Sequence, residues 1–297
     1  MLNLSVVIAA QDAGPQLRKC LAVLVPQLSL ADMEAIVAAG PENAETRRVT
    51  AEFPSVRFLH LSAQDIVPRL WSAGIAAARG RIIALTIENC TPAPDWVRRI
   101  RDAHAAECQG IGGAIAIDPS ATLVDWAVYF CRYSSYMPPF SPRLLDDIPG
   151  DNCSYKREAL DRVQHLMGDG FWETFIHYDM RRRHEKLLSD PLPVVIYSGG
   201  LSAWRFLKRR YIHGRYFAAR RGRDFTRGQR MLRAASFLAV PVLLSNRIVG
   251  RVWRHGRHRA KLVIALPLIG CFLMAWAVGE GVGYFFGFAL NGAPRKD

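Results

Sequence analysis

Short apolar runs alternate with amphipathic segments over the first 120 residues of the chain. Residues 4–10 are apolar and β-branched, as in strands buried on both faces of a parallel sheet. Similar runs predict further strands over residues 33–38, 56–61 and 81–86. The intervening segments predict helices over residues 16–28, 42–52 and 66–79. Successive βα units with short connections predict an open, mostly parallel α/β sheet.

The pattern loosens beyond residue 117. Residues 125–136 are rich in aromatic side chains, and residues 137–149 contain four prolines, which predicts a loop. Helical periodicity then predicts helices over residues 152–162 and 173–188, followed by a closing strand over residues 193–197. No internal repeat interrupts this order.

The last third of the chain contains two apolar segments. Residues 262–290 hold one acid, Glu280, and are long enough to cross a bilayer of about 30 Å, although a buried core helix has the same composition. Residues 234–244 are also apolar, but they are few and include Pro241, which predicts an interfacial or re-entrant position. We therefore expect one crossing at about 262–290, with residues 234–250 at the interface.

The net charge of +13 is concentrated in one segment. Residues 205–261 contain 17 of the 39 basic side chains and a single acid, Asp224. This distribution argues against a uniformly basic nucleic-acid-binding fold, and it favours contact with anionic lipid headgroups or a lipid diphosphate. By the positive-inside tendency, residues 1–261 should face the cytoplasm.

The chain shows no basic leader sequence before its first strand, so no secretory signal peptide is expected. Its six cysteines are scattered without a CxxC pair, which excludes a zinc ribbon and predicts a reducing compartment.

The fourth predicted strand ends in the most informative stretch of the sequence, residues 84–96. A hydrophobic strand runs into Glu88, Asn89 and Cys90, turns through two prolines, and leads into a helix at Trp96. Ligands of open α/β sheets bind at the carboxyl ends of strands, so Glu88 is a candidate ligand-binding acid. The simpler alternative is a loop acid that caps the next helix, and Cys90 fits a small packing residue.

Together with residues 4–10, this stretch resembles the family 2 glycosyltransferases of the GT-A fold, whose fourth strand ends in an Asp-x-Asp motif. Residues 150–160 resemble the family's acceptor-side Gly-x-Asn-x-x-Tyr-x-Arg segment, and residues 170–173 resemble the region of its Glu-Asp catalytic pair. Residues 207–221 resemble the basic segment that follows the catalytic domain. The resemblance covers about residues 3–221.

The resemblance implies a Rossmann-like GT-A domain over residues 1–203, a basic juxtamembrane segment over 204–233 and a membrane-associated region over 234–297. It implies an inverting transfer from a nucleotide sugar to a lipid-linked or polysaccharide acceptor, at the cytoplasmic face of the inner membrane, as in cell-envelope polysaccharide synthesis. Membrane lipids are expected partners, nucleic acid is not, and an oligomer is left open.

Residue roles follow from the same resemblance. Glu173 is the expected catalytic base, with Asp179 as the fallback; a solvated acid in the first helical turn is the simpler alternative. The expected donor-binding residues are Ala9, Ala10, Gln11, Arg69, Glu88 and Asn89. The expected acceptor-binding residues are Asn152, Trp172, Arg210 and Arg215.

Two departures from the family pattern weaken the metal site. The acid that usually follows the second strand is replaced by Ala38, Ala39 and Gly40, and Asp-x-Asp is reduced to Glu88-Asn89-Cys90. A divalent cation, Mg²⁺ or Mn²⁺, would then depend on Glu88 and the donor phosphates, with arginines sharing the diphosphate charge. The lost acids motivate one alternative, a non-catalytic GT-A module that binds a nucleotide sugar, a lipid or a partner protein; a membrane-associated RNA-binding protein is a second.

Overall fold

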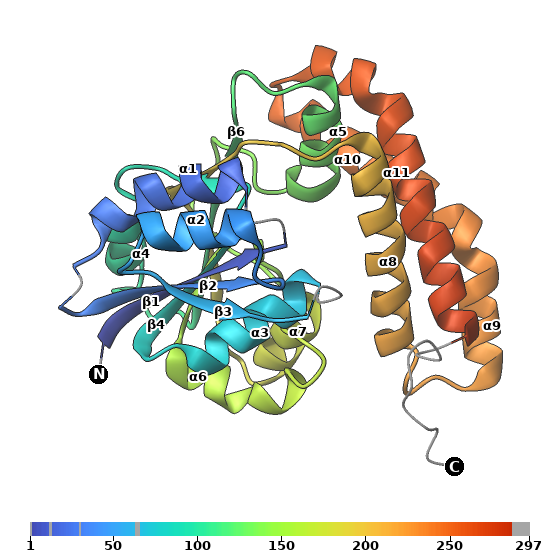
Figure 1. Ribbon diagram of the computed structural model, residues 1–297. Helices are drawn as coiled ribbons and strands as arrows, with labels where there is room; N and C mark the ends of the chain where they lie inside the picture. The colour runs from blue at the N-terminus through green and yellow to red at the C-terminus, as the bar shows by residue number, and fades with distance from the viewer. Residues whose placement is uncertain (1, 12–13, 30, 63–65, 287–297) are drawn as a thin grey trace. The chain divides into compact units, whose positions relative to one another are not determined.

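The computed structural model describes residues 2–11, 14–29, 31–62 and 66–286 (Figure 1). The chain divides into two compact units, which are described separately. The first comprises residues up to 118 together with 136–198, and the second comprises residues 119–135 and those from 199 onward. The first unit differs from the expected catalytic domain over 1–203 in two respects, because residues 119–135 and 199–203 group with the C-terminal helices.

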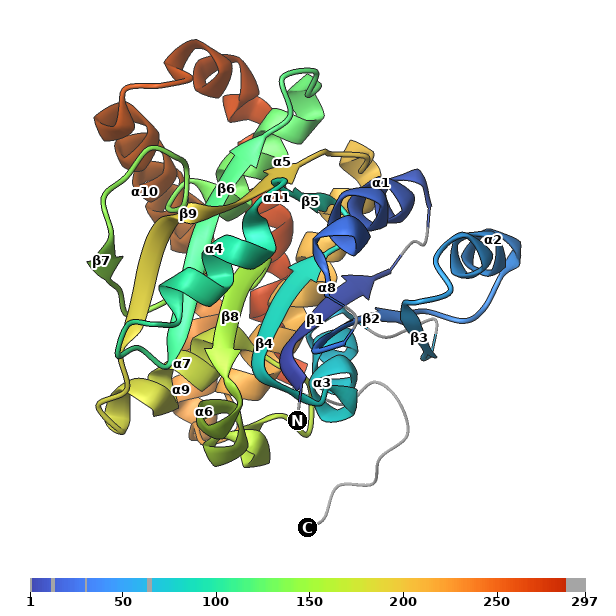
Figure 2. The same cartoon turned by 90° about the vertical axis from the view of Figure 1, so that its left-hand side faces the viewer.

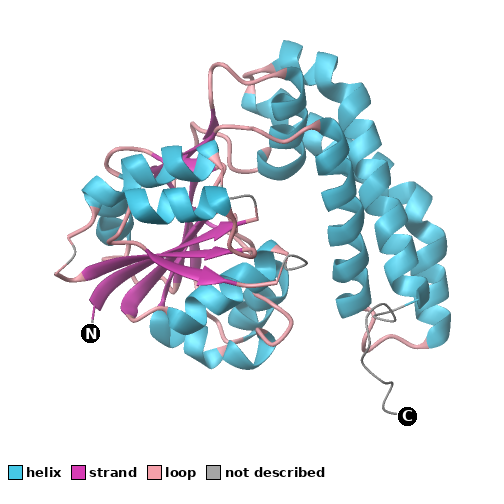
Figure 3. Ribbon diagram, viewed as in Figure 1, coloured by secondary structure: helices cyan, strands magenta, loops and turns pink. Residues whose placement is uncertain are grey.

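A single mixed sheet forms the centre of the first unit (Figures 2 and 3). Its order is β3-β2-β1-β4-β8-β6-β9-β5, and β7 pairs with β9. The strands are β1 (Leu2–Ala10), β2 (Met33–Ala39), β3 (Arg57–His60), β4 (Gly80–Ile87), β5 (Cys90–Pro92), β6 (Gly110–Ile117), β7 (Arg143–Leu144), β8 (Asn152–Lys156) and β9 (Leu187–Tyr197).

The N-terminal half of the sheet confirms the expected parallel arrangement. Strands β3, β2, β1 and β4 run parallel to one another. Leu4, Val6 and Ile8 of β1 are fully buried, as are Val7 and Ala9 on the opposite face. Burial on both faces explains why these strands read as continuous apolar runs in the sequence.

The expected helix over residues 152–162 is wrong in its first half. Residues 152–156 form β8, which lies between β4 and β6 and is antiparallel to both. Only Arg157–Arg162 is helical, as α6. The polar residues of β8 gave no strand pattern, and their conformation is imposed by pairing with a strand on each side.

The expected helix over residues 173–188 is too long. Helix α7 (Glu173–Arg182) stops before His184, which has a left-handed backbone with φ of 59°. The chain then enters β9, which is longer than the expected strand over 193–197 and already begins at Leu187.

Helices cover both faces of the sheet (Figure 1). Helices α1 (Pro15–Leu24) and α2 (Ala44–Glu52) lie on one face, and α3 (Val67–Ala77), α6 and α7 lie on the other. Helix α4 (Trp96–Ala103) packs on β9, and 3-10 turns occupy Val25–Gln27 and Gln164–Leu166. The side chain of Asn43 accepts hydrogen bonds from the first turn of α2, which fixes where that helix begins.

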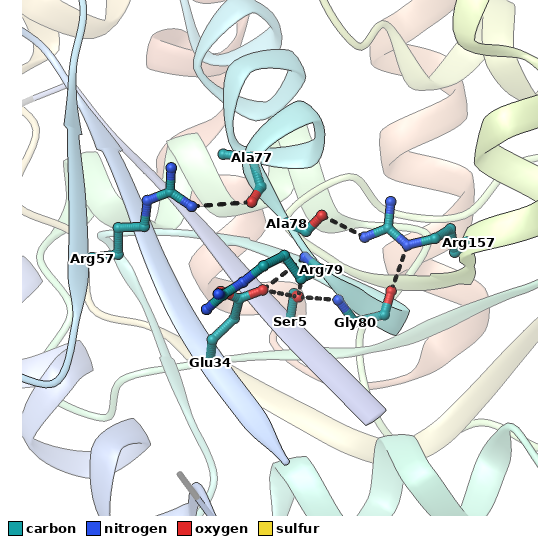
Figure 4. A network of polar contacts seen from close by, with 8 residues as sticks. All are labelled: Ser5, Glu34, Arg57, Ala77, Ala78, Arg79, Gly80 and Arg157. Carbon is teal, nitrogen blue, oxygen red and sulfur yellow. Dashed lines mark hydrogen bonds and ion pairs between the residues drawn. The ribbon is translucent and has the colours of Figure 1, made fainter. Parts of the chain in front are cut away.

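A buried carboxylate ties the amino ends of three strands together (Figure 4). Glu34 on β2 accepts hydrogen bonds from the Ser5 hydroxyl at 2.7 Å and from the Arg79 backbone N–H at 2.7 Å, and it pairs with the Arg79 guanidinium at 3.0 Å. Burial would raise the pKa of Glu34, but these hydrogen bonds and the charge of Arg79 outweigh it, so its pKa lies below the ordinary value. Arg157 continues the network by donating to the carbonyls of Gly80 and Ala78.

The second unit is helical. Its elements are α5 (Leu123–Tyr133), α8 (Ala203–Arg221), α9 (Arg227–Ala235), a 3-10 turn (Ser236–Leu238), α10 (Ala239–His255) and α11 (Arg259–Phe286). Among the described residues, two helical stretches meet the requirement for a membrane span by length and composition, Arg227–His255 and Arg259–Phe286. The apolar run at 234–244 thus belongs to a longer helical stretch than we expected. Residues 287–290 of the expected span lie outside the described residues.

Helices α8 and α11 pack backbone against backbone through glycines. A Cβ atom at Gly279 would overlap the Tyr211 carbonyl oxygen, and one at Gly283 would overlap the Arg215 carbonyl oxygen. A Cβ atom at Gly214 would likewise overlap the Trp276 carbonyl oxygen. Small residues four apart on a helix permit this close approach, which larger side chains would prevent.

The Glu34 network predicts a pH-dependent loss of stability in Glu34→Gln. Because the folded pKa of Glu34 is depressed, its contribution is present above the unfolded pKa of about 4.3 and is lost as the pH falls through the folded value. Urea unfolding should show Glu34→Gln destabilised by about 1–3 kcal/mol at pH 7, with a smaller difference at pH 3. Glu52→Gln, which removes an exposed ion pair with Arg18, should change stability by less than about 1 kcal/mol. Equal losses for Glu34→Gln at both pH values would contradict the role of its charge.

The glycine contacts predict opposite effects for two alanine substitutions on α11. Gly279→Ala should destabilise the second unit by about 1–3 kcal/mol, because the new methyl group must displace the backbone of α8. Gly281→Ala should be neutral or stabilising, since its nearest neighbour would lie 3.5 Å away and alanine favours helix. Thermal unfolding in one detergent compares the two variants, and equal melting temperatures would show that the close contact is not required.

Candidate active site

The carboxyl ends of β1 and β4 bring several of the expected donor-binding residues together. Ala9 pairs with Ile87 in the parallel register, and the Glu88 backbone N–H donates to the Ala9 carbonyl at 3.2 Å. Ala10 ends β1, and Gln11 follows it. The structure therefore brings Ala9, Ala10, Glu88 and Asn89 together at one edge of the sheet, where ligands of open α/β sheets bind.

Glu88 is largely enclosed, with 4% of its surface exposed. It lies near Cys20 of α1, whose thiol contacts the Cys90 carbonyl at 3.6 Å. Burial, with the nearby charge of Glu88, raises the pKa of Cys20 to about 12. Cys20 is therefore a neutral thiol at pH 7, and Cys90, fully buried on β5, is a packing residue as expected.

The loop after β4 is anchored to the end of β9. The Asn89 carbonyl accepts from the Ser198 backbone N–H at 2.8 Å and from the Ser198 hydroxyl at 3.1 Å. Both Glu88 and Asn89 are buried, so the loop that carries the candidate ligands is held rigidly against the sheet.

Glu173 is the first residue of α7 and lies next to Gly150. A Cβ atom at Gly150 would approach the Glu173 carboxyl carbon to 3.2 Å and the Trp71 ring to 2.9 Å. Glu173 itself is partly exposed, so its carboxylate can meet a substrate. The absence of a side chain at Gly150 leaves the space in which this carboxylate sits.

Hydrogen bonds connect the surroundings of Glu173 to the end of β4. The Trp71 indole N–H donates to the Thr86 carbonyl at 2.9 Å, and the Thr86 hydroxyl donates to the Asp151 carbonyl at 3.0 Å. Thr86 lies two residues before Glu88. The candidate base and the candidate donor-binding loop are thus linked through Gly150, Asp151 and β4.

Arg69 occupies the first turn of α3 and has an exposed side chain. The same turn meets the segment that leads into α7, because the Phe171 backbone N–H donates to the Pro68 carbonyl at 2.7 Å. Gly170 has φ of 114° and packs against the backbone of Pro68 and Arg69, where a Cβ atom would not fit. The turn that carries Arg69 therefore contacts the segment that immediately precedes Glu173.

A chain of three polar side chains, of which Tyr155 and His177 are buried, stabilises α7 one turn beyond Glu173. The Tyr155 hydroxyl lies 2.7 Å from His177 Nε2, and His177 Nδ1 is hydrogen-bonded to Asp147. Burial raises the pKa of Tyr155 well above its ordinary value, and nearby acidic groups that include Glu173 add to the effect. Tyr155 therefore keeps its proton and donates to Nε2, which leaves the Nδ1 proton directed at Asp147.

The sequence did not single out His177 or Asp147. The available signal was the spacing of His177, four residues after Glu173 and therefore on the same face of the helix. Asp147 lies in the proline-rich loop, and its sequence gave no indication of a contact 30 residues away.

Asn152 and Trp172 are more deeply buried than expected for residues that touch an acceptor. The Asn152 amide group donates to the Ala114 carbonyl at 2.7 Å and to the Pro193 carbonyl at 2.9 Å, and its oxygen accepts from the Trp96 indole at 2.8 Å. Both amide protons are thus used within the fold, so Asn152 holds β8, β6 and β9 together beneath the site. Trp172 is 4% exposed and donates to the Asp169 carbonyl at 3.3 Å.

The remaining expected residues are Asp179 on α7 and two arginines on α8. Asp179, the fallback base, forms an ion pair with Arg183 at 2.7 Å. Arg210 and Arg215 belong to α8 in the second unit, where the Arg210 guanidinium lies 4.2 Å from the centre of the Trp276 ring.

Within the described residues, no group of three or more His, Cys, Asp or Glu side chains is arranged to hold a metal ion. Glu88 is the expected protein ligand of a metal ion. Mg²⁺ is commonly bound by one or two carboxylates together with substrate phosphates, and a single acid at the carboxyl edge of the sheet fits that mode.

Comparisons with known proteins agree with the geometry. A family described as Glycosyl transferase family 2 matches residues 5–164. A solved structure described as a mannosyltransferase, PcManGT from Pyrobaculum calidifontis in complex with GDP-Man and Mn2+, is similar with a TM-score of 0.55 and 14% identity, covering 94% of this chain and 86% of that chain.

A second solved structure, described as that of a mycobacterial protein, has a TM-score of 0.50 and 14% identity, covering 72% of this chain and 73% of that chain. At this identity the two likenesses show the fold alone. No curated protein matches the chain.

Proposed function

The chain belongs to glycosyl transferase family 2 and has the GT-A fold, and on this premise we propose that it is a membrane-associated, inverting glycosyltransferase. The proposed donor is a nucleoside diphosphate sugar, and the proposed acceptor is a lipid-linked or polysaccharide hydroxyl. The observation that carries the proposal is the position of Glu173, a partly exposed carboxylate linked through Gly150 and Asp151 to the end of β4.

The donor would bind at the carboxyl ends of β1 and β4. The backbone at Ala9, Ala10 and Gln11 lines this edge for the nucleotide, and Glu88 and Asn89 lie beside it. Arg69 would pair with a phosphate of the donor, since a guanidinium binds phosphate oxygens in a bidentate manner. A divalent ion bound by Glu88 and the diphosphate would neutralise charge on the leaving group.

Glu173 would act as the general base on the acceptor side. Its carboxylate accepts the proton of the acceptor hydroxyl as that oxygen forms a bond to the anomeric carbon. The bond from that carbon to the nucleoside diphosphate breaks on the opposite face, so the configuration inverts. The products are the glycosylated acceptor, a nucleoside diphosphate and a protonated Glu173.

The Tyr155–His177–Asp147 chain supports this role by fixing α7. His177 is 1% exposed and is held from both ring nitrogens, so α7 has little freedom to rotate about its axis. Base catalysis needs the carboxylate held in place against the reacting hydroxyl, and anchoring the helix one turn away serves that purpose.

The second unit supports a location at the membrane. Its basic helix α8 and its two stretches of membrane length suit an acceptor carried by a lipid, with Arg210 and Arg215 as proposed contacts to acceptor phosphates. Nucleotide sugars are found in the cytoplasm, so we place the catalytic domain on the cytoplasmic face of the inner membrane.

One observation favours a second candidate function. The carboxylates usual after the second and fourth strands are reduced to Glu88, which is also largely enclosed. A module that binds a nucleotide sugar without transferring it would tolerate that loss. Activity measurements on the parent chain separate the two functions.

The metal role of Glu88 predicts a cation-dependent affinity for nucleotide. Mn²⁺ should tighten the binding of UDP or GDP to the parent chain, and Glu88→Ala should abolish that increase while leaving the metal-free affinity within about twofold. Isothermal titration with Mn²⁺ or with chelator measures both affinities. Equal binding by the parent chain in the two buffers would leave the arginines, Arg69 first, to hold the diphosphate.

The base assignment predicts a selective loss of transfer in Glu173→Gln. The substitution keeps the side-chain volume and removes the proton acceptor, so transfer should fall about 10²–10⁴-fold while donor binding changes less than about twofold. Product formation with a panel of nucleotide sugars and membrane lipid extract, followed by mass spectrometry, gives the rate.

Asp179→Asn is the matched control, because Asp179 is an acid of the same helix that already pairs with Arg183. It should transfer at a rate close to that of the parent. Parent-like transfer by Glu173→Gln would remove the assignment. Nucleotide-sugar binding by a parent chain that transfers nothing would favour the non-catalytic module.

A further inference from the structure

Helix α8 is strongly basic along its whole length. It contains seven Lys and Arg residues and no acid, and its exposed side chains include Arg205, Lys208 and Arg221. Trp204, 76% exposed, stands at its first turn. A helix of this composition is stable where its cations reach water or lipid headgroups, and it is excluded from hydrocarbon.

Helix α8 runs parallel to the second half of α11 and in constant register with it. Phe206 meets Phe272 with ring centres 4.7 Å apart, the Tyr211 carbonyl faces Gly279, and the Arg215 carbonyl faces Gly283. The glycine contacts bring the backbones of α8 and α11 together, so neither lipid nor another helix fits between them. Helix α8 therefore shares the depth of α11 from about residue 272 to residue 284.

This register conflicts with a simple crossing by α11. If residues 259–286 spanned a bilayer, the second half of α11 would carry the cations of α8 into the hydrocarbon core. Charged side chains there are rare and costly unless they are paired or in contact with water. The part of α11 that precedes its contact with α8 at Phe272, residues 262–271, rises only about 15 Å, half of the roughly 30 Å needed.

The helical stretch Arg227–His255 is also too short in its uncharged part to cross a bilayer. Its uncharged part lies between Arg233 and Arg247 and rises about 20 Å. Exposed cations then continue through Arg251 and Arg254 to the turn before α11, where Arg257 is also exposed. The apolar part of this stretch is thus short and bounded by cations.

Five apolar side chains with more than half of their surface accessible in the unit lie within these two segments: Leu238, Val242 and Leu243 before and on α10, and Val263 and Ile264 on α11. Met231 and Leu232 on α9 and Phe285 and Phe286 at the end of α11 are also exposed and lie outside these segments. An apolar surface bordered by cations matches the interface of an anionic bilayer, where side chains enter the acyl region and guanidinium groups stay at the phosphates.

We infer that the second unit enters one leaflet of an anionic bilayer and does not cross it. Helices α10 and α11 lie in the interface with their exposed apolar side chains submerged, and the cations of α8 and of the α10–α11 turn contact lipid phosphates. This inference rests on the proposed membrane association, and it replaces the single crossing expected at 262–290.

Labelling of single cysteines tests the topology in the full chain. In a Cys271→Ser background, Arg257→Cys marks the α10–α11 turn, Asp297→Cys marks the end of the chain, and Arg48→Cys on α2 marks the catalytic side. A membrane-impermeant maleimide should label all three from the same side of oriented membrane vesicles. Labelling of position 297 from the opposite side would show a crossing by α11, and labelling of position 257 from the opposite side would show a hairpin; either result overturns the inference.

Vesicle binding tests the lipid chemistry. The purified full chain should bind vesicles containing phosphatidylglycerol much more tightly than vesicles of phosphatidylcholine. Arg205→Gln with Lys208→Gln should weaken binding to the anionic vesicles about 25-fold, or about fivefold for each cation removed. The matched control, Arg47→Gln with Arg48→Gln on exposed positions of α2, removes the same charge and should stay within about twofold.

Equal affinity for anionic and neutral vesicles, or equal losses in the two double variants, would overturn the inference. A dimer that forms without vesicles and buries the apolar side chains would assign this surface to a second copy of the chain, and it would also overturn the inference. Sugar transfer to a water-soluble acceptor is measured separately on the same variants. If the parent chain transfers no sugar, that result would count against the proposed enzyme. The labelling pattern tests only the topology of the second unit.

Discussion

The buried amide of Asn152 is the contact on which the arrangement of the central sheet depends. From β8 it donates to Ala114 on β6 and to Pro193 on β9, and it accepts from Trp96 at the start of α4. Gly113 makes this possible, because a Cβ atom there would overlap both the Asn152 amide and the Pro193 carbonyl. The β6–β9 register shifts at the same place, between Gly112 and Ala114, so the irregularity in the ladder is where the amide enters.

The position of β8 in turn sets the geometry of the candidate site. Because β8 pairs with β4, the loop that precedes it reaches the carboxyl end of β4, where the Asp151 carbonyl accepts from Thr86. Gly150 in that loop provides the space for Glu173, and Tyr155 at the far end of β8 holds His177. One short polar strand therefore orients both the base and the helix that carries it.

The sequence predicted those strands whose burial follows from their own apolar residues. Strands β1, β2 and β4 are apolar on both faces, so their residues alone indicated them. Strand β8 was missed because Asn152 and Ser154 are buried by virtue of partners far away in the chain, Pro193 and His104 among them.

The same distinction applies to the candidate site. Glu88 and Glu173 follow recognisable local patterns, whereas the Tyr155–His177–Asp147 chain joins three segments separated by 22 and 30 residues. A pattern in one segment carries no information on such a contact. The early end of α7 could not be predicted for the same reason. His184 adopts a left-handed backbone, and a non-glycine residue with positive φ has no strong sequence signal.

Glu280 shows how packing changes the meaning of a residue within an apolar run. In the sequence it is a single acid between hydrophobic segments, and so it suggests a charge inside a membrane. In the structure its carboxylate accepts from the Trp276 indole at 3.1 Å and from the Tyr284 hydroxyl at 3.4 Å. The Arg210 guanidinium stacks on the same Trp276 ring, and its charge interacts favourably with Glu280. The acid therefore balances the basic helix packed beside it, and its presence in α11 is explained by α8 without a position in the hydrocarbon core.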